Sequence, residues 1–149
     1  MATTEKFVST DAYGNALMLA KVVSVDTSGE PALPSAGERW QYAAASGGIS
    51  NTTTAVTIKA AHATLRNYIT SIQIAAEALG AATELAIRDG AGGTVLWRTK
   101  IGTGGITAGE AIVFPVPLKG TAATLLEVVT LTASVTGAVY VNCQGFVAA

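Results

Sequence analysis

The chain from Trp40 onward alternates apolar runs with breaks that contain Gly, Asn or Thr. Most runs change from apolar to polar with a period of two, which is typical of strands with one buried and one exposed face. This spacing favours an antiparallel sandwich or barrel over βαβ units. The eight runs are WQYAAAS (40–46), TAVTIKAA (54–61), YITSIQIAAEA (68–78), TELAIRD (83–89), TVLWRTKI (94–101), EAIVFPVPL (110–118), TLLEVVTLTA (124–133) and AVYVNCQGFV (138–147).

The alternation predicts which side chains face the core. Ile72 and Ile74 share one face of their run, and Leu85 and Ile87 share one face of the next. The stretch RDGAGGTVLW predicts a tight hairpin, because its glycines permit the positive φ angles that such a turn needs. The same alternation places these further residues inward: Val95, Trp97, Ile101, Ile112, Phe114, Val116 and Leu118.

Two prolines interrupt the run at 110–118. Pro115 and Pro117 have no backbone N–H and cannot donate to a sheet ladder, so the run is predicted to be an edge strand. Prolines at an edge also block the pairing of a further strand. We therefore expect any subunit contact at this strand to be made by side chains and not by an added strand.

Residues 1–39 have a different pattern. They contain one short strand candidate, LMLAKVVSV (17–25), among turns rich in Gly, Ser and Pro. Such a segment cannot build a core of its own, and we interpret it as an extended N-terminal arm, the alternative being a disordered tail. The side chains that would anchor an arm on another surface are Phe7, Tyr13, Leu17 and Leu19.

Composition excludes several classes of partner. Half of the 149 residues are hydrophobic, only 13% are charged, and the net charge is −1. Because the Lys and Arg residues are scattered, nucleic acid is not an expected partner. No run predicts a transmembrane helix, and no signal peptide is visible, so we expect synthesis and assembly in a cytoplasm and no membrane partner. A surface so poor in charge favours burial against other chains.

Candidate chemistry is sparse. His62 and Cys143 are the only residues of their types, so no disulfide within the chain, no metal site and no cofactor is expected, and we predict a protein that is not an enzyme. The carboxylates lie on separate runs without a shared motif. Glu127 stands out, because it lies within the apolar TLLEVVTL. Either Glu127 is paired, or its face is outward and buried against another subunit; we favour the second interpretation.

Four motifs in order carry a resemblance: YITSIQI, RDGAGGTVLW, FPVPLKGTAATLLEV and GAVYVNCQGF. With the leading VDTSGEP, the chain resembles small virion proteins of tailed bacteriophages, and within them the jelly-roll cement, or decoration, proteins. The resemblance implies an all-β, eight-stranded antiparallel jelly-roll sandwich (40–149) preceded by the arm (1–39). It also implies a homotrimer, the major capsid protein of the phage head as partner, and a location on the exterior of the virion head. It brings no active-site residues.

A second hypothesis is a tail-fibre or receptor- and carbohydrate-binding head domain of a phage. Such sites present exposed aromatic platforms, for which Trp40, Tyr42 and Trp97 are the candidates. The residues expected at interfaces with other chains are therefore Phe7, Tyr13, Leu17, Leu19, Trp40, Tyr42, Pro115, Pro117 and Glu127.

Overall fold

The computed structural model describes residues 9–10, 16–17 and 38–149. Strand β1 (Ser9–Thr10) pairs with β2 (Ala16–Leu17) in a small antiparallel sheet. Phe7, Tyr13, Leu19 and most of the strand expected at 17–25 lie outside the described residues. The compact unit is Ala36–Ala149.

Each of the eight predicted runs overlaps one strand of this unit, and β4 is an additional short strand that pairs with β11. The runs 83–89 and 94–101 match their strands to the residue. The strands are β3 (Arg39–Tyr42), β4 (Ile49–Ser50), β5 (Val56–Lys59), β6 (Arg66–Ala76), β7 (Thr83–Asp89), β8 (Thr94–Ile101), β9 (Ile106–Lys119), β10 (Leu126–Thr130) and β11 (Ala138–Ala148).

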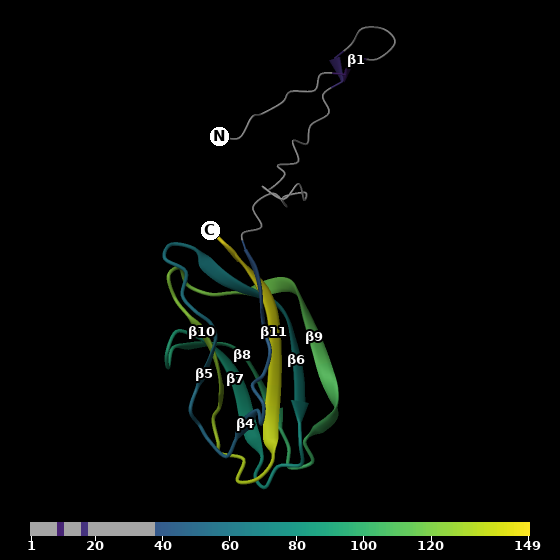
Figure 1. The fold of residues 1–149 in the computed structure, drawn as a ribbon, viewed down its shortest axis with the longest axis vertical. Helices are drawn as coiled ribbons and strands as arrows, with labels where there is room; N and C mark the ends of the chain where they lie inside the picture. Colours follow the sequence, from purple (N-terminus) through teal and green to yellow (C-terminus); the bar gives the residue numbers. More distant parts are fainter. Residues whose placement is uncertain (1–8, 11–15, 18–37) are drawn as a thin grey trace. The chain divides into compact units, whose positions relative to one another are not determined.

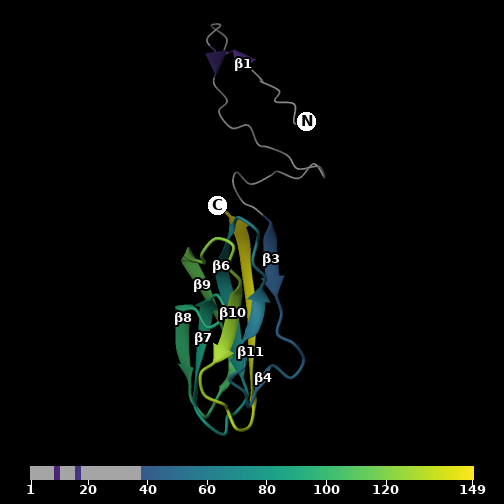
Figure 2. The same ribbon diagram turned by 90° about the vertical axis from the view of Figure 1, so that its left-hand side faces the viewer.

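The strands form two antiparallel sheets packed face to face, as Figures 1 and 2 show. One sheet has the order β5-β10-β7-β8, and the other has the order β3-β11-β6-β9 with β4 beside β11. The pairs β3·β11, β5·β10, β6·β9 and β7·β8 nest inside one another along the chain and alternate between the sheets. A single long hairpin rolled up in this way is a jelly roll, so the predicted fold class is confirmed.

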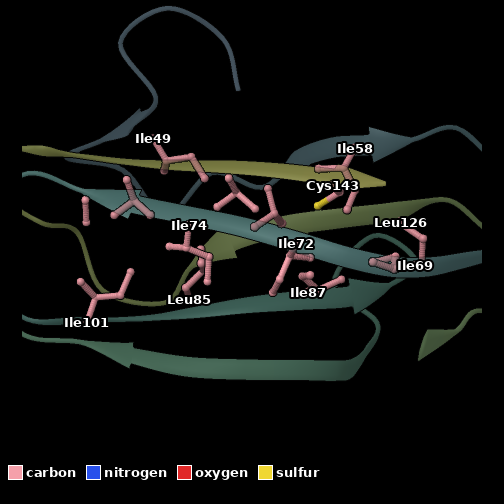
Figure 3. Packing of buried hydrophobic residues seen from close by; sticks show 14 of the residues in the cluster. Ile49, Ile58, Ile69, Ile72, Ile74, Leu85, Ile87, Ile101, Leu126 and Cys143 are labelled. Atoms are coloured by element: carbon pink, nitrogen blue, oxygen red, sulfur yellow. The ribbon is translucent and has the colours of Figure 1, made fainter. Parts of the chain in front are cut away.

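The core lies between the two sheets. Figure 3 shows Ile72 and Ile74 of β6 directed toward Leu85 and Ile87 of β7, with the Cys143 sulfur beside Ile58. These side chains are almost completely buried, which confirms the period-two alternation of the runs.

The hairpin predicted at RDGAGGTVLW joins β7 to β8. Gly90 and Gly92 have φ angles of 90° and 66°, and the Gly93 N–H donates to the Gly90 carbonyl at 3.0 Å. The positive φ angles explain why glycine occupies these positions.

Strand β9 is the edge strand that Pro115 and Pro117 predicted, because within residues 38–149 it pairs with β6 alone. Its pairing jumps from Leu118, opposite Ile69, to Val113, opposite Ser71. The four residues Phe114–Pro117 are therefore outside the ladder, and we call them the proline bulge.

The bulge also gives one side chain, that of Val116, the opposite orientation from the predicted one. Val116 was expected inward, but it is 81% exposed. The prediction was wrong because the extra residues break the strict alternation on which it relied. Phe114 keeps its inward position and meets Trp97 of β8 edge-on, with ring centroids 6.5 Å apart. This contact closes the sandwich where the edges of the two sheets run side by side.

Candidate binding surface

The outward faces of the two sheets differ in charge. The outward face of the four-stranded sheet carries two ion pairs, Arg88 with Glu127 and Arg98 with Glu84. The outward face of the five-stranded sheet is lined at its centre by Gln41, Ser71, Gln73, Asn142 and Gln144. A face without central charges can be covered by a neutral surface without the cost of burying charged groups, so it is the better candidate for binding.

A depression of about 300 Å³ lies in this uncharged face, and we call it the amide hollow. Its walls come from β3, β11, β6 and β9, so all the long strands of the sheet contribute. Ala111 and Val113 of β9 form its apolar side. The other lining residues are Gln41, Tyr42, Ala43, Ser71, Ile72, Gln73, Asn142, Cys143 and Gln144.

Hydrogen bonds fix part of the amide hollow. Asn142 Oδ1 accepts from the Ala44 backbone N–H at 2.9 Å, and Gln144 Oε1 accepts from the Ser71 hydroxyl at 3.5 Å. Each of these two amide oxygens already accepts one hydrogen bond, so the NH₂ groups of Asn142 and Gln144 are the freer ends for a ligand. Within residues 38–149, the Gln41 and Gln73 side chains make no hydrogen bond to other protein groups.

The ionisable groups in the lining are neutral at physiological pH. Burial raises the pKa of the Cys143 thiol to about 12. Burial and the neighbouring Cys143 raise the pKa of the Tyr42 phenol above its usual 10.0. The hollow therefore favours an uncharged ligand that accepts hydrogen bonds.

The proline bulge borders this surface and presents exposed apolar side chains. Val113, the residue before the bulge, is 71% exposed, and Val116 is 81% exposed. None of Val113–Pro117 carries a charge. The amide hollow and the proline bulge together are the uncharged surfaces of this sheet.

Glu127 lies in the other sheet and is buried and paired. Its carboxylate forms an ion pair with Arg88, with Nη2 2.6 Å from Oε1, and accepts a hydrogen bond from the Gly92 backbone N–H at 2.8 Å. Only 5% of the residue is exposed, so the chain itself already covers it. Glu127 is therefore paired within the chain, as one of the two interpretations had it, and its burial does not require another subunit; contact of its outward face with another subunit stays a prediction.

The remaining candidate interface residues do not meet at one site. Trp40 is buried and lies against Gly145, whereas Tyr42 is half-buried in the lining of the hollow. Pro115 is exposed and Pro117 half-buried on β9, the edge opposite β3. Leu17 ends β2, and nothing in the structure bears on its side chain.

The four amides of the hollow were missed by sequence reasoning. Their signal is present, since Gln73 alternates with Ile72 and Ile74, and Asn142 and Gln144 alternate with Cys143. Recognising a shared site also required the pairing of β3 with β11, which lie about a hundred residues apart in the chain.

His62 has a local structural role in the loop between β5 and β6. Its Nδ1 accepts the backbone N–H groups of Thr64 and Leu65 at 3.3 Å and 3.2 Å. Across the described part of the chain, no three His, Cys, Asp or Glu side chains gather as a metal site, and no helix is long and apolar enough to cross a membrane.

No protein-family profile, curated protein or solved structure matches the chain.

Proposed function

We propose that the chain is a virion structural protein that decorates the outer surface of an assembled phage head and stabilises the contacts between capsomers. The proposed partners are further copies of the chain, in a homotrimer, and the major capsid protein. The observation that carries the proposal is the uncharged, hollowed outward face of the β3-β11-β6-β9 sheet with exposed Val113 and Val116 beside it. The jelly-roll topology and the motif resemblance support it.

The two outward faces fit such a role physically. An uncharged face with exposed valines is suited to contacts that stay formed, and the ion-paired face around Arg88 and Glu127 is suited to solvent. A trimer that binds a symmetric shell multiplies weak contacts through effective concentration, so each copy needs only a modest interface. Residues 1–39, as an arm, would add area when bound.

Copy number tests the proposal. Quantitative mass spectrometry of purified virions should find the chain in hundreds of copies, in a fixed ratio to the major capsid protein. A handful of copies would assign the chain to the tail and contradict head decoration.

Two further measurements test separate parts of the proposal. Removal of residues 1–37 should weaken binding to heads, and unchanged binding would refute the role of the arm. Light scattering of the purified chain at micromolar concentration should give a trimer, and a monomer would refute the homotrimer. For the truncated protein, circular dichroism should show the same β-sheet spectrum as the full chain.

The alternative, a receptor- or carbohydrate-binding head of a tail fibre, depends on exposed aromatic platforms. Both tryptophans of the sequence are turned into the sandwich, Trp40 against Gly145 and Trp97 against Phe114. Tyr42 is half-buried in the hollow. This observation ranks head decoration above the alternative.

A further inference from the structure

The amide hollow is rich in hydrogen-bond donors. Gln41, Gln73, Asn142 and Gln144 each carry an NH₂ group with two N–H donors. The oxygens of Asn142 and Gln144 each already accept one hydrogen bond, from the Ala44 N–H and the Ser71 hydroxyl, which leaves their NH₂ groups as the freer ends for a ligand. A complementary surface would supply acceptors without charge, together with an apolar group to meet Ala111 and Val113.

The proline bulge has this complementary chemistry. Its four residues carry four carbonyl groups, but Pro115 and Pro117 lack an N–H, so only Phe114 and Val116 have one. None of the four is paired with β6. The bulge is therefore rich in acceptors and poor in donors, and Val116 projects from it as an exposed apolar side chain.

We propose that the proline bulge of one copy docks in the amide hollow of the next copy. The hollow supplies NH₂ donors to the unpaired carbonyls of the bulge, and Val116 is buried against the apolar side of the hollow. Neither surface carries a charge, so the contact buries none. The second copy is the occupant because this chain itself presents the complementary surface.

The contact joins two different surfaces of the chain, and in the proposed trimer it is head-to-tail, since a reciprocal pair of such contacts would stop at a dimer. A head-to-tail contact closes into a ring when the rotation between copies permits it, and open growth otherwise follows. Three copies in a ring would use every bulge and every hollow. Pro115 and Pro117 also remove two N–H groups from the free edge of β9, which disfavours the addition of a strand of another copy at the bulge and is compatible with docking there.

This inference rests on the self-association within the proposed function. It concerns only the surface through which copies meet, and it can fail while decoration of the head stands.

Engineered disulfides test the contact. Copies with Gln73→Cys and copies with Val116→Cys, mixed under unfolding conditions, refolded together and oxidised, should form a reducible covalent dimer. The double variant should form covalent trimers. Cys143 is buried and does not compete. The matched control is Val135→Cys mixed with Gln73→Cys, because Val135 is also exposed but lies in the β10–β11 loop. Cross-linking no greater than in this control would overturn the inference.

A second pair of variants tests the association of copies without a cross-link. Val116→Asp places a charge in the uncharged contact and should convert the trimer into monomers in light scattering. Val135→Asp should leave the trimer intact. A Val116→Asp protein that remains trimeric would overturn the inference but not the homotrimer.

Two further results distinguish failure of the contact between bulge and hollow from failure of head decoration. If the unaltered chain is a monomer, the inference and the homotrimer both fail, and sedimentation with heads still tests decoration. If Gln73→Cys on assembled heads cross-links to the major capsid protein in place of Val116→Cys, the hollow belongs to the shell contact and the inference is overturned.

Discussion

Arg88 Nη2 lies 2.6 Å from Glu127 Oε1, and this pair joins β7 to β10 on the outward face of the four-stranded sheet. The Gly92 N–H of the β7–β8 turn donates to the same oxygen at 2.8 Å. The carboxylate therefore ties a strand and a turn to β10 while it is almost completely buried.

Loss of this carboxylate should destabilise the fold. Glu127→Gln leaves the Arg88 charge without its counter-charge while it keeps an oxygen that can accept from the Gly92 N–H, and we expect a loss of roughly 3 kcal/mol in the free energy of unfolding, the lower end of the range for broken buried pairs. Chemical denaturation measures it. The control is Glu84→Gln, whose partner Arg98 is largely exposed, with an expected loss below about 1 kcal/mol. Equal losses in the two variants would contradict the structural role of Glu127.

Gly145 has no room for a side chain. A Cβ at this position would lie 1.9 Å from the Tyr68 carbonyl oxygen and 2.6 Å from the Trp40 ring. Since the nearer obstacle is backbone, Gly145→Ala should lose about 3 kcal/mol or more of unfolding free energy, the upper end of overpacking costs. Gly102→Ala is the control, because a Cβ there meets nothing within 4 Å. A stable Gly145→Ala protein would show that β11 lies differently against β6 and β3.

Cys143 should make stability depend on alkaline pH. Burial raises the pKa of its thiol from 9.0 to about 12, so both folded and unfolded chains keep the proton below pH 9. Above pH 9 the unfolded thiol loses its proton while the folded thiol keeps it, and this favours the unfolded chain by about 1.4 kcal/mol per pH unit.

Denaturant unfolding at pH 8 and at pH 10.5 measures this effect. The loss between these pH values should be about 2 kcal/mol larger for the unaltered chain than for Cys143→Ala. Tyr and Lys residues titrate in both proteins, so their contributions cancel in the difference, apart from the part of the Tyr42 pKa that Cys143 itself raises. Identical pH profiles would mean that the thiol is open to solvent.

The prolines of β9 should protect the edge more than they stabilise the fold. Replacing both Pro115 and Pro117 by Val restores two N–H groups at an exposed edge, which favours pairing with other chains. We expect a change below about 1 kcal/mol in unfolding free energy, because neither proline is in the ladder, together with faster aggregation in light scattering. The control is Val113→Ile, which adds apolar surface but no further N–H group. It should aggregate at the same rate as the unaltered chain. A double variant that aggregates no faster would refute the protective role.

The local alternation of apolar and polar residues was sufficient to predict the strands and the fold class. Period-two alternation located Ile72, Ile74, Leu85 and Ile87 in the core, and the missing N–H groups of Pro115 and Pro117 identified an edge. The alternation predicted the wrong orientation where the backbone departs from regular strand geometry. A bulge turned Val116 outward, and no local signal gives the size of a bulge.

The candidate surface depends on long-range pairing, which the pattern does not contain. Gln41 reaches Gln144 only because β3 pairs with β11, and Glu127 finds Arg88 only because β10 lies beside β7. An isolated carboxylate in an apolar run is compatible with an interface or an ion pair, and the partner strand decides between them.

Rebinding of the purified protein to heads tests whether the chain decorates the capsid. Heads of the phage that encodes the chain, prepared without it, would be mixed with the purified protein, sedimented and imaged with a label at Ala149. If the chain decorates the head, we expect saturable binding and labels distributed over the outside of the head. The decorated heads should also withstand heating better than bare ones. Failure to sediment with heads, or labels found only on tails, would contradict it.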